Sequence, residues 1–289
     1  MSGTGGKEWP LICFTLLSQT AVGAFWTWAA FFLVMGNTGG GGEFGFLTIP
    51  VLTALGAVLG LAAAISFFHL GKLWRAVFVL NNLRRSWLSR EILFELAFLF
   101  MIALLAFLEW HGVGLPFVIG GLVALAAVIG FCFLFSMAKI YMLTTVPVWR
   151  GPHTIASFFL SALLLGPLAA AAGQGSLYKY SDRTHSFQDI AAFVSLSAVV
   201  LIVLMILFLT PRVGFLGARK TTLLEYPADR MYPYLAFRIL FLGAATLFLV
   251  AFHKKQEIGR LISFALASAV AAEVLGRRLF YAIYSRVGV

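Results

Sequence analysis

Two polar residues stand at the ends of two long apolar segments, and their types suit proton transfer. His69 closes one segment, and Glu91 opens the next one 22 residues later. In an antiparallel helix pair, the end of one helix lies beside the start of the other, so the two side chains can share one pocket at the membrane edge. Imidazole titrates near neutral pH, and a buried carboxylate can accept a proton. The pair therefore predicts oxidation of a hydroquinone, which has an apolar ring and must lose two protons with two electrons.

Simpler interpretations of the same residues stay open. Ser86 or Ser89 can cap the helix that holds Glu91, which would leave this carboxylate in the first turn, where the helix dipole favours negative charge. His69 can serve as a helix cap or a packing residue. Glu95 lies one turn deeper on the same face as Glu91, where an ionisable group is costly and is usually functional or paired.

Other polar groups surround this pair or lie deep in apolar segments. Gln19 is inside the first apolar segment, where it can hydrogen-bond to a neighbouring helix or contact a quinone carbonyl. Glu273 is four residues before Arg277, which predicts an ion pair on one helix face, and Arg238 is expected to extend to lipid headgroups. A basic loop predicts a docking surface for an electron-accepting subunit, with phospholipid headgroups as the alternative ligand; its cations are Lys72, Arg75, Arg84, Arg85 and Arg90.

The elements that must position these residues are membrane helices. Of the 289 residues, 61% are hydrophobic and 11% are charged, whereas a soluble domain has roughly 25% charged residues. A span needs about 20 mostly apolar residues, and backbone groups in hydrocarbon must be paired internally, so such segments are helices. We expect an all-α membrane bundle of about eight transmembrane helices, forming one domain over 1–289, with spans at 10–35, 47–70, 90–109, 115–140, 154–173, 188–210, 234–252 and 260–284.

The composition argues against several other classes of site. The net charge is +10, but the basic residues separate apolar segments, which favours a membrane surface or an acidic protein partner over nucleic acid. Cys13 and Cys132 lie inside apolar segments, and two thiols are too few for an iron–sulfur cluster, which needs four. We expect no metal site in this chain.

Charge also bears on orientation. Eight spans place both termini on the same side of the membrane, and 16 of the 21 Lys and Arg residues then lie on that side. The positive-inside rule would put both termini in the cytoplasm.

Three stretches together resemble a known family. The first is His69-Leu70-Gly71 with Arg75 and Glu91 at their spacing; the second is the opening Glu8-Trp9-Pro10-Leu11; the third is the closing segment Glu273-Val274-Leu275-Gly276-Arg277-Arg278. The chain resembles, over its whole length, the membrane-anchor subunits of dimethyl sulfoxide reductases.

The resemblance implies a function in anaerobic respiration. Such anchors lie in the prokaryotic inner membrane, oxidise menaquinol and pass electrons to an iron–sulfur subunit, which feeds a molybdopterin catalytic subunit; the anchor itself holds no haem or metal. His69 would then contact the quinol, Glu91 would take part in proton release, and Gly71 and Arg75 would shape the site. The family usually has both termini on the periplasmic side, opposite to the side that the charge count favours.

Two alternatives of other classes remain at this point. A haem b subunit of a quinol oxidoreductase needs paired histidines at matched depth, and His69 and His153 share a predicted side. A secondary transporter tends to have charges near the midplane and repeated halves, whereas this chain has most of its charges at span ends.

Overall fold

The computed structural model describes residues 9–36, 41–69, 82–142, 149–178, 191–206, 228–255 and 258–282; at some helix ends, 67–69 among them, it describes the backbone alone. The chain forms two compact units, Met1–Tyr141 and Met142–Val289. Throughout the described ranges the regular structure is helical, without a strand. The prediction of an all-α membrane bundle is confirmed.

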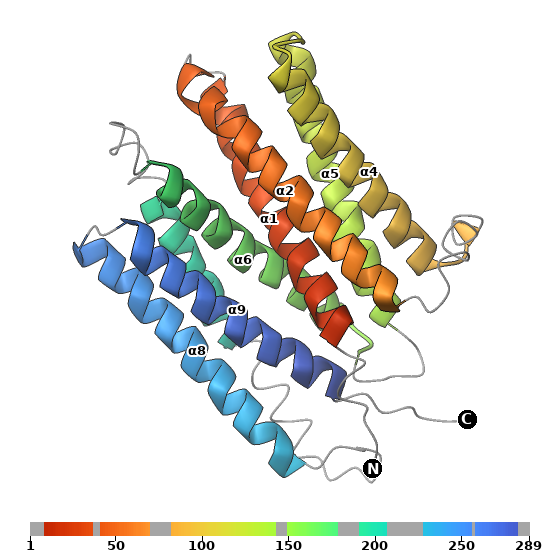
Figure 1. Cartoon of the computed structure of the whole chain (residues 1–289). Coiled ribbons are helices and arrows are strands. Elements are labelled where there is room, and N and C mark those ends of the chain that lie inside the picture. Colours follow the sequence, from red (N-terminus) through yellow and green to blue (C-terminus); the bar gives the residue numbers. More distant parts are fainter. Residues whose placement is uncertain are drawn as a thin grey trace. The chain divides into compact units, whose positions relative to one another are not determined.

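In the residues that the structure describes, unit 1 (Met1–Tyr141) is a bundle of four long helices. They are α1 (Trp9–Gly36), α2 (Gly41–His69), α4 (Trp87–Trp110) and α5 (Pro116–Tyr141). Each helix packs on two others, in the order α1, α2, α4, α5 and back to α1. The starts of α1 and α4 and the ends of α2 and α5 lie together at one end of the unit (Figure 1), which we call the Glu91 end.

Local sequence signals set where the helices of unit 1 begin and turn. Ser86 caps α4, because its hydroxyl accepts a hydrogen bond from the Ser89 backbone N–H at 3.2 Å. Gly112 and Gly114 have φ angles of 60° and 129° in the short turn between α4 and α5, a backbone conformation that glycine adopts readily. Pro116 then opens α5, where its missing N–H costs no helical hydrogen bond.

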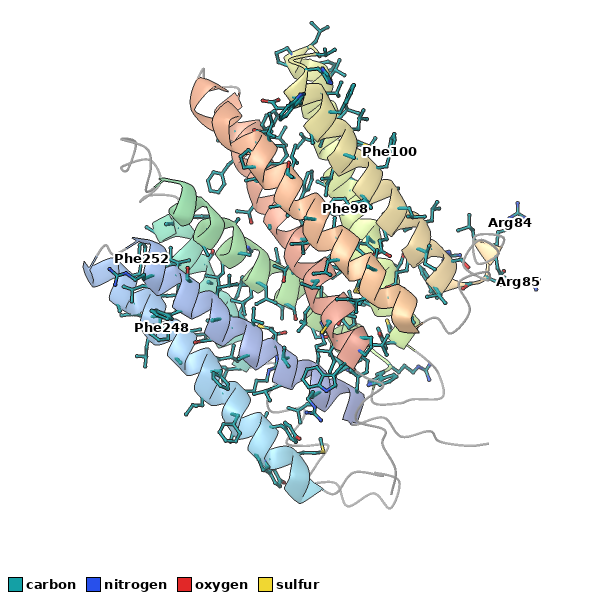
Figure 2. All side chains as sticks on the ribbon, viewed as in Figure 1. Arg84, Arg85, Phe98, Phe100, Phe248 and Phe252 are labelled. Atoms are coloured by element: carbon teal, nitrogen blue, oxygen red, sulfur yellow. The ribbon has the colours of Figure 1, made fainter. Side chains whose placement is uncertain are left out.

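Aromatic side chains fill the middle of unit 1. Phe25 of α1 meets Phe98 of α4 edge to face, with ring centroids 5.3 Å apart. A Cβ atom at Gly130 of α5 would lie 3.2 Å from the Phe98 ring and 3.1 Å from Val22, so this glycine lets α5 approach closely. Figure 2 shows Phe98 and Phe100 on α4; Phe98 is fully buried and Phe100 is 65% exposed, as expected when lipid covers the outer face.

Unit 2 (Met142–Val289) contains α6 (Pro152–Tyr178), the helix Ala191–Ile206, α8 (Ala228–Lys255) and α9 (Ile258–Ala282). The helix α9 packs on both α8 and α6. Trp149, just before α6, donates its indole N–H to the Phe280 carbonyl of α9 at 3.0 Å and stacks on the Phe280 ring.

A buried polar cluster joins three helices of unit 2. Glu273 of α9 pairs with Arg238 of α8 at 3.0 Å and accepts a hydrogen bond from Ser161 of α6. Arg277 donates to the Ser161 hydroxyl at 3.4 Å and lies 3.8 Å from the Phe158 ring centroid. Arg238 is only 6% exposed, so the prediction that it extends to headgroups was wrong; the carboxylate that holds it comes from another helix.

Each of the eight expected spans coincides with a helix in the described residues. Six of these helices are long and apolar enough to cross a membrane by length and composition: α1, α2, α4, α5, α6 and α8. The helix Ala191–Ile206 is shorter, and α9 contains four charged residues, Arg260, Glu273, Arg277 and Arg278. The ends differ from the predicted ends by a few residues; α4, for example, begins at Trp87 rather than at residue 90.

Candidate functional site

The candidate site is built on the first two turns of α4. Because Ser86 is the N-cap, the helix begins at Trp87 and Glu91 lies in the second turn. The interpretation that placed Glu91 in the first turn, as a partner of the helix dipole, was therefore wrong. Ser89, Glu91 and Glu95 are all buried, and Glu91 and Glu95 lie on the side of α4 that also carries Phe98.

Glu91 and Glu95 are buried acids, and in the residues that the structure describes neither forms an ion pair. They are 5% and 7% exposed, and within the described ranges neither has a hydrogen bond to its carboxyl group. The Glu95 Oε1 atom is fully buried without a partner there. Burying a carboxyl group without hydrogen bonds is costly, and such groups within a membrane mark functional sites.

The helix α1 brings polar groups to the same depth as Glu91. Seven residues make nearly two helical turns, so Ser18 lies on the side of α1 that carries Phe25, and Glu91 on the side of α4 that carries Phe98. Phe25 and Phe98 meet, and α1 and α4 run in the same direction. Ser18 and Glu91 therefore lie at the same depth, about two turns nearer the Glu91 end than the Phe25–Phe98 contact. The Ser18 hydroxyl is buried and has no hydrogen-bond partner in the described part of the chain.

Gln19 belongs to this layer as well. Its amide Nε2 lies 3.9 Å from the Met137 sulfur of α5, and both residues are fully buried. Met137 follows Gly130 by seven residues, and Gly130 packs against Phe98. Because α5 runs antiparallel to α4, Met137 is at the height of Glu91. The predicted helix-to-helix contact of Gln19 is thus present, at the depth of the candidate site.

The end of α2 reaches the same height. Gly56 of α2 lies against Ile102 of α4, with 3.8 Å between an added Cβ and the Ile102 methyl group. His69 is 13 residues after Gly56, and Ser89 is 13 residues before Ile102. At the same rise per residue, the backbone of His69 is level with Ser89, about half a turn from Glu91. The His69 side chain and the whole of Gly71, Lys72 and Arg75 lie outside the described residues.

Cations and aromatic rings surround the start of α4. The Arg90 guanidinium lies 4.2 Å from the Trp87 ring centroid, and the Lys139 ammonium of α5 lies 5.5 Å from it. Arg90 also donates to the carbonyl groups of Leu83 and Arg84, each at 2.8 Å. These bonds fix the preceding loop, from which Arg84 and Arg85 extend away from the helices (Figure 2).

Comparison with known proteins decides the family. Residues 1–283 match the family described as the DMSO reductase anchor subunit (DmsC). The chain belongs to the DMSO reductase anchor subunit family.

Curated relatives in this anchor-subunit family are similar over nearly their whole length. The protein is 28% identical to a subunit of the anaerobic dimethyl sulfoxide reductase of Haemophilus influenzae, with 99% of this protein and 98% of the relative covered. Two subunits of the same kind of reductase in Escherichia coli K12 are similar at the same coverage. One of them, named YnfH, is 28% identical, and the other is 27% identical.

Family membership confirms the resemblance drawn from the terminal and central motifs. The chain is a membrane-anchor subunit, and the names of its relatives, as parts of a reductase, imply catalytic and electron-transfer partners. In the described ranges, no three His, Cys, Asp or Glu side chains come together as they would around a metal ion.

Sequence reasoning overlooked two features of the site. One is Met137, which contacts Gln19 from α5; a methionine in an apolar segment gives no signal by itself. The other is the position of Lys139 beside Trp87. The sequence could have indicated this contact, because Lys139 ends one span and Trp87 begins the span before it. These two ends lie on the same side of the membrane.

Proposed function

We propose that this anchor subunit oxidises menaquinol at the Glu91 end of unit 1 and passes the electrons to an iron–sulfur partner subunit. That partner would feed a molybdopterin subunit in an anaerobic respiratory chain of the inner membrane. The observation that carries the proposal is a pair of buried carboxyl groups, in a layer with Gln19 and Ser18, at the height where α2 ends in His69.

The residues of this layer suit the quinol in both polarity and chemistry. A hydroquinone offers two hydroxyl groups on an apolar ring, and it forms the quinone by losing two protons and two electrons. His69 would accept a hydrogen bond and a proton from one hydroxyl group, and Glu91 would accept the proton of the other. Gln19 would donate to the quinone carbonyl. Gly71 and Arg75 would shape the site, as the family resemblance implies. The electrons would leave to the partner's iron–sulfur cluster.

The loop before α4 supports a partner on the same side. Arg84 and Arg85 are exposed, and the hydrogen bonds of Arg90 to the carbonyl groups of this loop hold it in place. An acidic face on the iron–sulfur subunit would dock on Arg84, Arg85 and Lys72, with Arg90 setting the position of the loop. Docking there would keep the path for electrons short, and complementary charge would set the register.

The experiment compares two electron donors in the assembled complex. Glu91→Gln keeps the size and polarity of the side chain but removes the proton acceptor, and His69→Ala removes the imidazole. We expect each change to lower menaquinol-dependent turnover by a factor of about 10² or more, the usual contribution of a positioned acid or base. Turnover with an artificial dye, which reduces the partner subunits directly, should stay at the wild-type level.

Glu109→Gln is the matched control, because Glu109 lies on the same helix near its other end and is half-buried. It should leave both activities unchanged. If Glu91→Gln and His69→Ala kept full quinol turnover in assembled complexes, the quinol site would have to lie elsewhere.

A further inference from the structure

We propose that Glu95 is a proton-relay residue behind Glu91: it receives the proton that Glu91 takes from the quinol and returns Glu91 to its proton-accepting form. This inference rests on the proposed function and adds a residue for which that function has no role. Three observations carry it: the position of Glu95 on α4, its buried oxygen without a partner in the described residues, and the apolar layer behind it.

The position of Glu95 suits transfer to and from Glu91. The two residues are four apart on α4, and side chains at this spacing are neighbours, with Cβ atoms about 5–6 Å apart. Both face the inside of unit 1. The Glu95 Oε1 atom is buried, and in the described residues it has neither a hydrogen-bond partner nor an ion pair.

The contrast with Glu273 shows what a structural acid looks like in this protein. Glu273 is equally buried, but Arg238 and Ser161 bind its two carboxyl oxygens. Glu95 has no such partners in the described ranges. A carboxyl group retained in the interior without them is expected to have a function.

An apolar layer closes the inner side of Glu95. The next buried residues on α4 are Phe98, Met101, Ile102 and Leu105. Phe98 packs on Phe25 and on the backbone of Gly130, close enough that an added Cβ at Gly130 would be 3.2 Å from its ring. On the buried side of α4, the ionisable group next to Glu95 is therefore Glu91, toward the Glu91 end. A proton on Glu95 returns by way of Glu91 rather than moving on along α4.

The step moves a proton and no electrons. The quinol O–H bond breaks, and the proton binds the Glu91 carboxylate while the electrons leave to the partner's iron–sulfur cluster. The Glu91 O–H bond then breaks and an O–H bond forms on the Glu95 carboxylate. Ser18 of α1 lies at the depth of Glu91 and has an unpaired hydroxyl in the described part of unit 1, so it can accept and donate a hydrogen bond during this transfer. After the quinone leaves, the proton goes back through Glu91 to solvent.

The test uses Glu95→Gln and Glu95→Asp in the assembled complex with menaquinol as donor, and Glu109→Gln as control. Glu95→Gln should lower kcat about tenfold or more without changing KM, because Glu95 does not touch the quinol. Glu95→Asp keeps a carboxyl group and should recover part of the lost rate. Dye-dependent turnover should be the same in all variants.

Infrared difference spectra of quinol oxidation give a readout that a packing role would not affect. The wild type should show two glutamic acid carboxyl bands that change on oxidation, and Glu95→Gln should lack one of them. If Glu95→Gln does not assemble, the relay is tested instead by the number of carboxyl bands in the wild-type spectrum and by the quinol turnover of Glu95→Asp. A single carboxyl band, or an assembled Glu95→Asp that loses all quinol turnover, would overturn the relay.

The failure of this inference can be told apart from failure of the proposed function. If Glu91→Gln stops quinol turnover while Glu95→Gln keeps the wild-type kcat, only the relay is wrong. If Glu95→Gln raises KM with kcat unchanged, Glu95 binds quinol directly and the relay is also wrong. If Glu91→Gln itself is fully active, the proposed function fails first.

Discussion

At the scale of single residues, this protein buries acidic side chains in two different ways. Glu273 lies among groups that satisfy it: the Arg238 guanidinium at 3.0 Å and the Ser161 hydroxyl. Glu91 and Glu95 are buried to a similar degree without such partners in the described ranges. The first arrangement compensates the buried charge, whereas the second leaves the carboxyl groups without such partners there, at a cost in stability.

This difference predicts opposite effects on stability. Arg238→Leu would leave the Glu273 carboxylate buried without its cation, so we expect the free energy of unfolding to fall by about 3 kcal/mol. Glu91→Gln and Glu95→Gln remove a buried acid that has no ion pair in the described residues, and each should leave stability unchanged or slightly raised. Unfolding of the purified protein in detergent measures all three.

The matched control is Arg260→Leu, because Arg260 lies on α9 but is exposed. It should change stability by less than about 0.5 kcal/mol. If Arg238→Leu were as mild as this control, the ion pair with Glu273 would not support unit 2.

The sequence predicted some of these residues and could not predict others. Glu91 and Glu95 stood out because an acid in an apolar segment is costly wherever it points. The sequence did not predict the partner of Arg238, because Glu273 is 35 residues away. A cation near the end of a span is equally compatible with a contact to lipid headgroups. The close packing of Gly276 against Arg238 was not predicted either; a Cβ atom at Gly276 would lie 2.7 Å from the Arg238 guanidinium carbon.

At the scale of elements, the start of α4 sets the depth of the site. Had Ser89 been the cap, Glu91 would lie in the first turn. Because Ser86 is the cap, α4 begins one turn earlier and Glu91 lies in its second turn, and Ser89 is buried. The sequence offered both serines; in the structure Ser86 accepts the Ser89 N–H, and Trp87 of the first turn packs on Phe135 of α5.

This assignment of the cap can be tested directly. Ser86→Ala removes the hydrogen bond to the Ser89 N–H and should cost about 1 kcal/mol in the first turn of α4. Amide hydrogen exchange at 87–90 should then be about fivefold faster, if the turn opens locally. Ser86→Asp, which also caps helices, should restore the wild-type rate. Equal exchange in Ser86→Ala and the wild type would show that Ser86 does not cap α4.

Helix existence was easier to predict than helix ends. Long apolar segments must be helical in hydrocarbon, which explains why each of the eight expected spans meets a helix. The ends depend on caps and tertiary packing, so α2 begins at Gly41 rather than at residue 47, and α6 continues to Tyr178 rather than ending at residue 173. The spans at 188–210 and 260–284 extend beyond the described residues.

At the scale of the whole molecule, the protein is a multi-pass membrane anchor of two compact units. That the two units form one membrane domain stays a prediction. The side of the membrane on which the termini lie stays open between the charge count, which favours the cytoplasm, and the family resemblance, which favours the periplasm.

An even number of spans nevertheless makes one prediction that does not depend on the side. Reporter proteins fused to the amino end in one strain and to the carboxyl end in another should report the same side of the membrane. Fusion in the turn at 111–115, between α4 and α5, is the matched control and should report the opposite side, because three spans precede it. Termini on opposite sides would mean that one of the eight helices does not cross.

The central claim is that quinol binds at the Glu91 end of unit 1, and photoaffinity labelling of the assembled complex with an azido-substituted menaquinone tests it most directly. Peptide mapping should find the label on segments of that end, within 9–20, 82–95 and 131–141, and excess menaquinol should prevent the labelling. Protectable label confined to unit 2, on 152–178 or 258–282, would contradict the account.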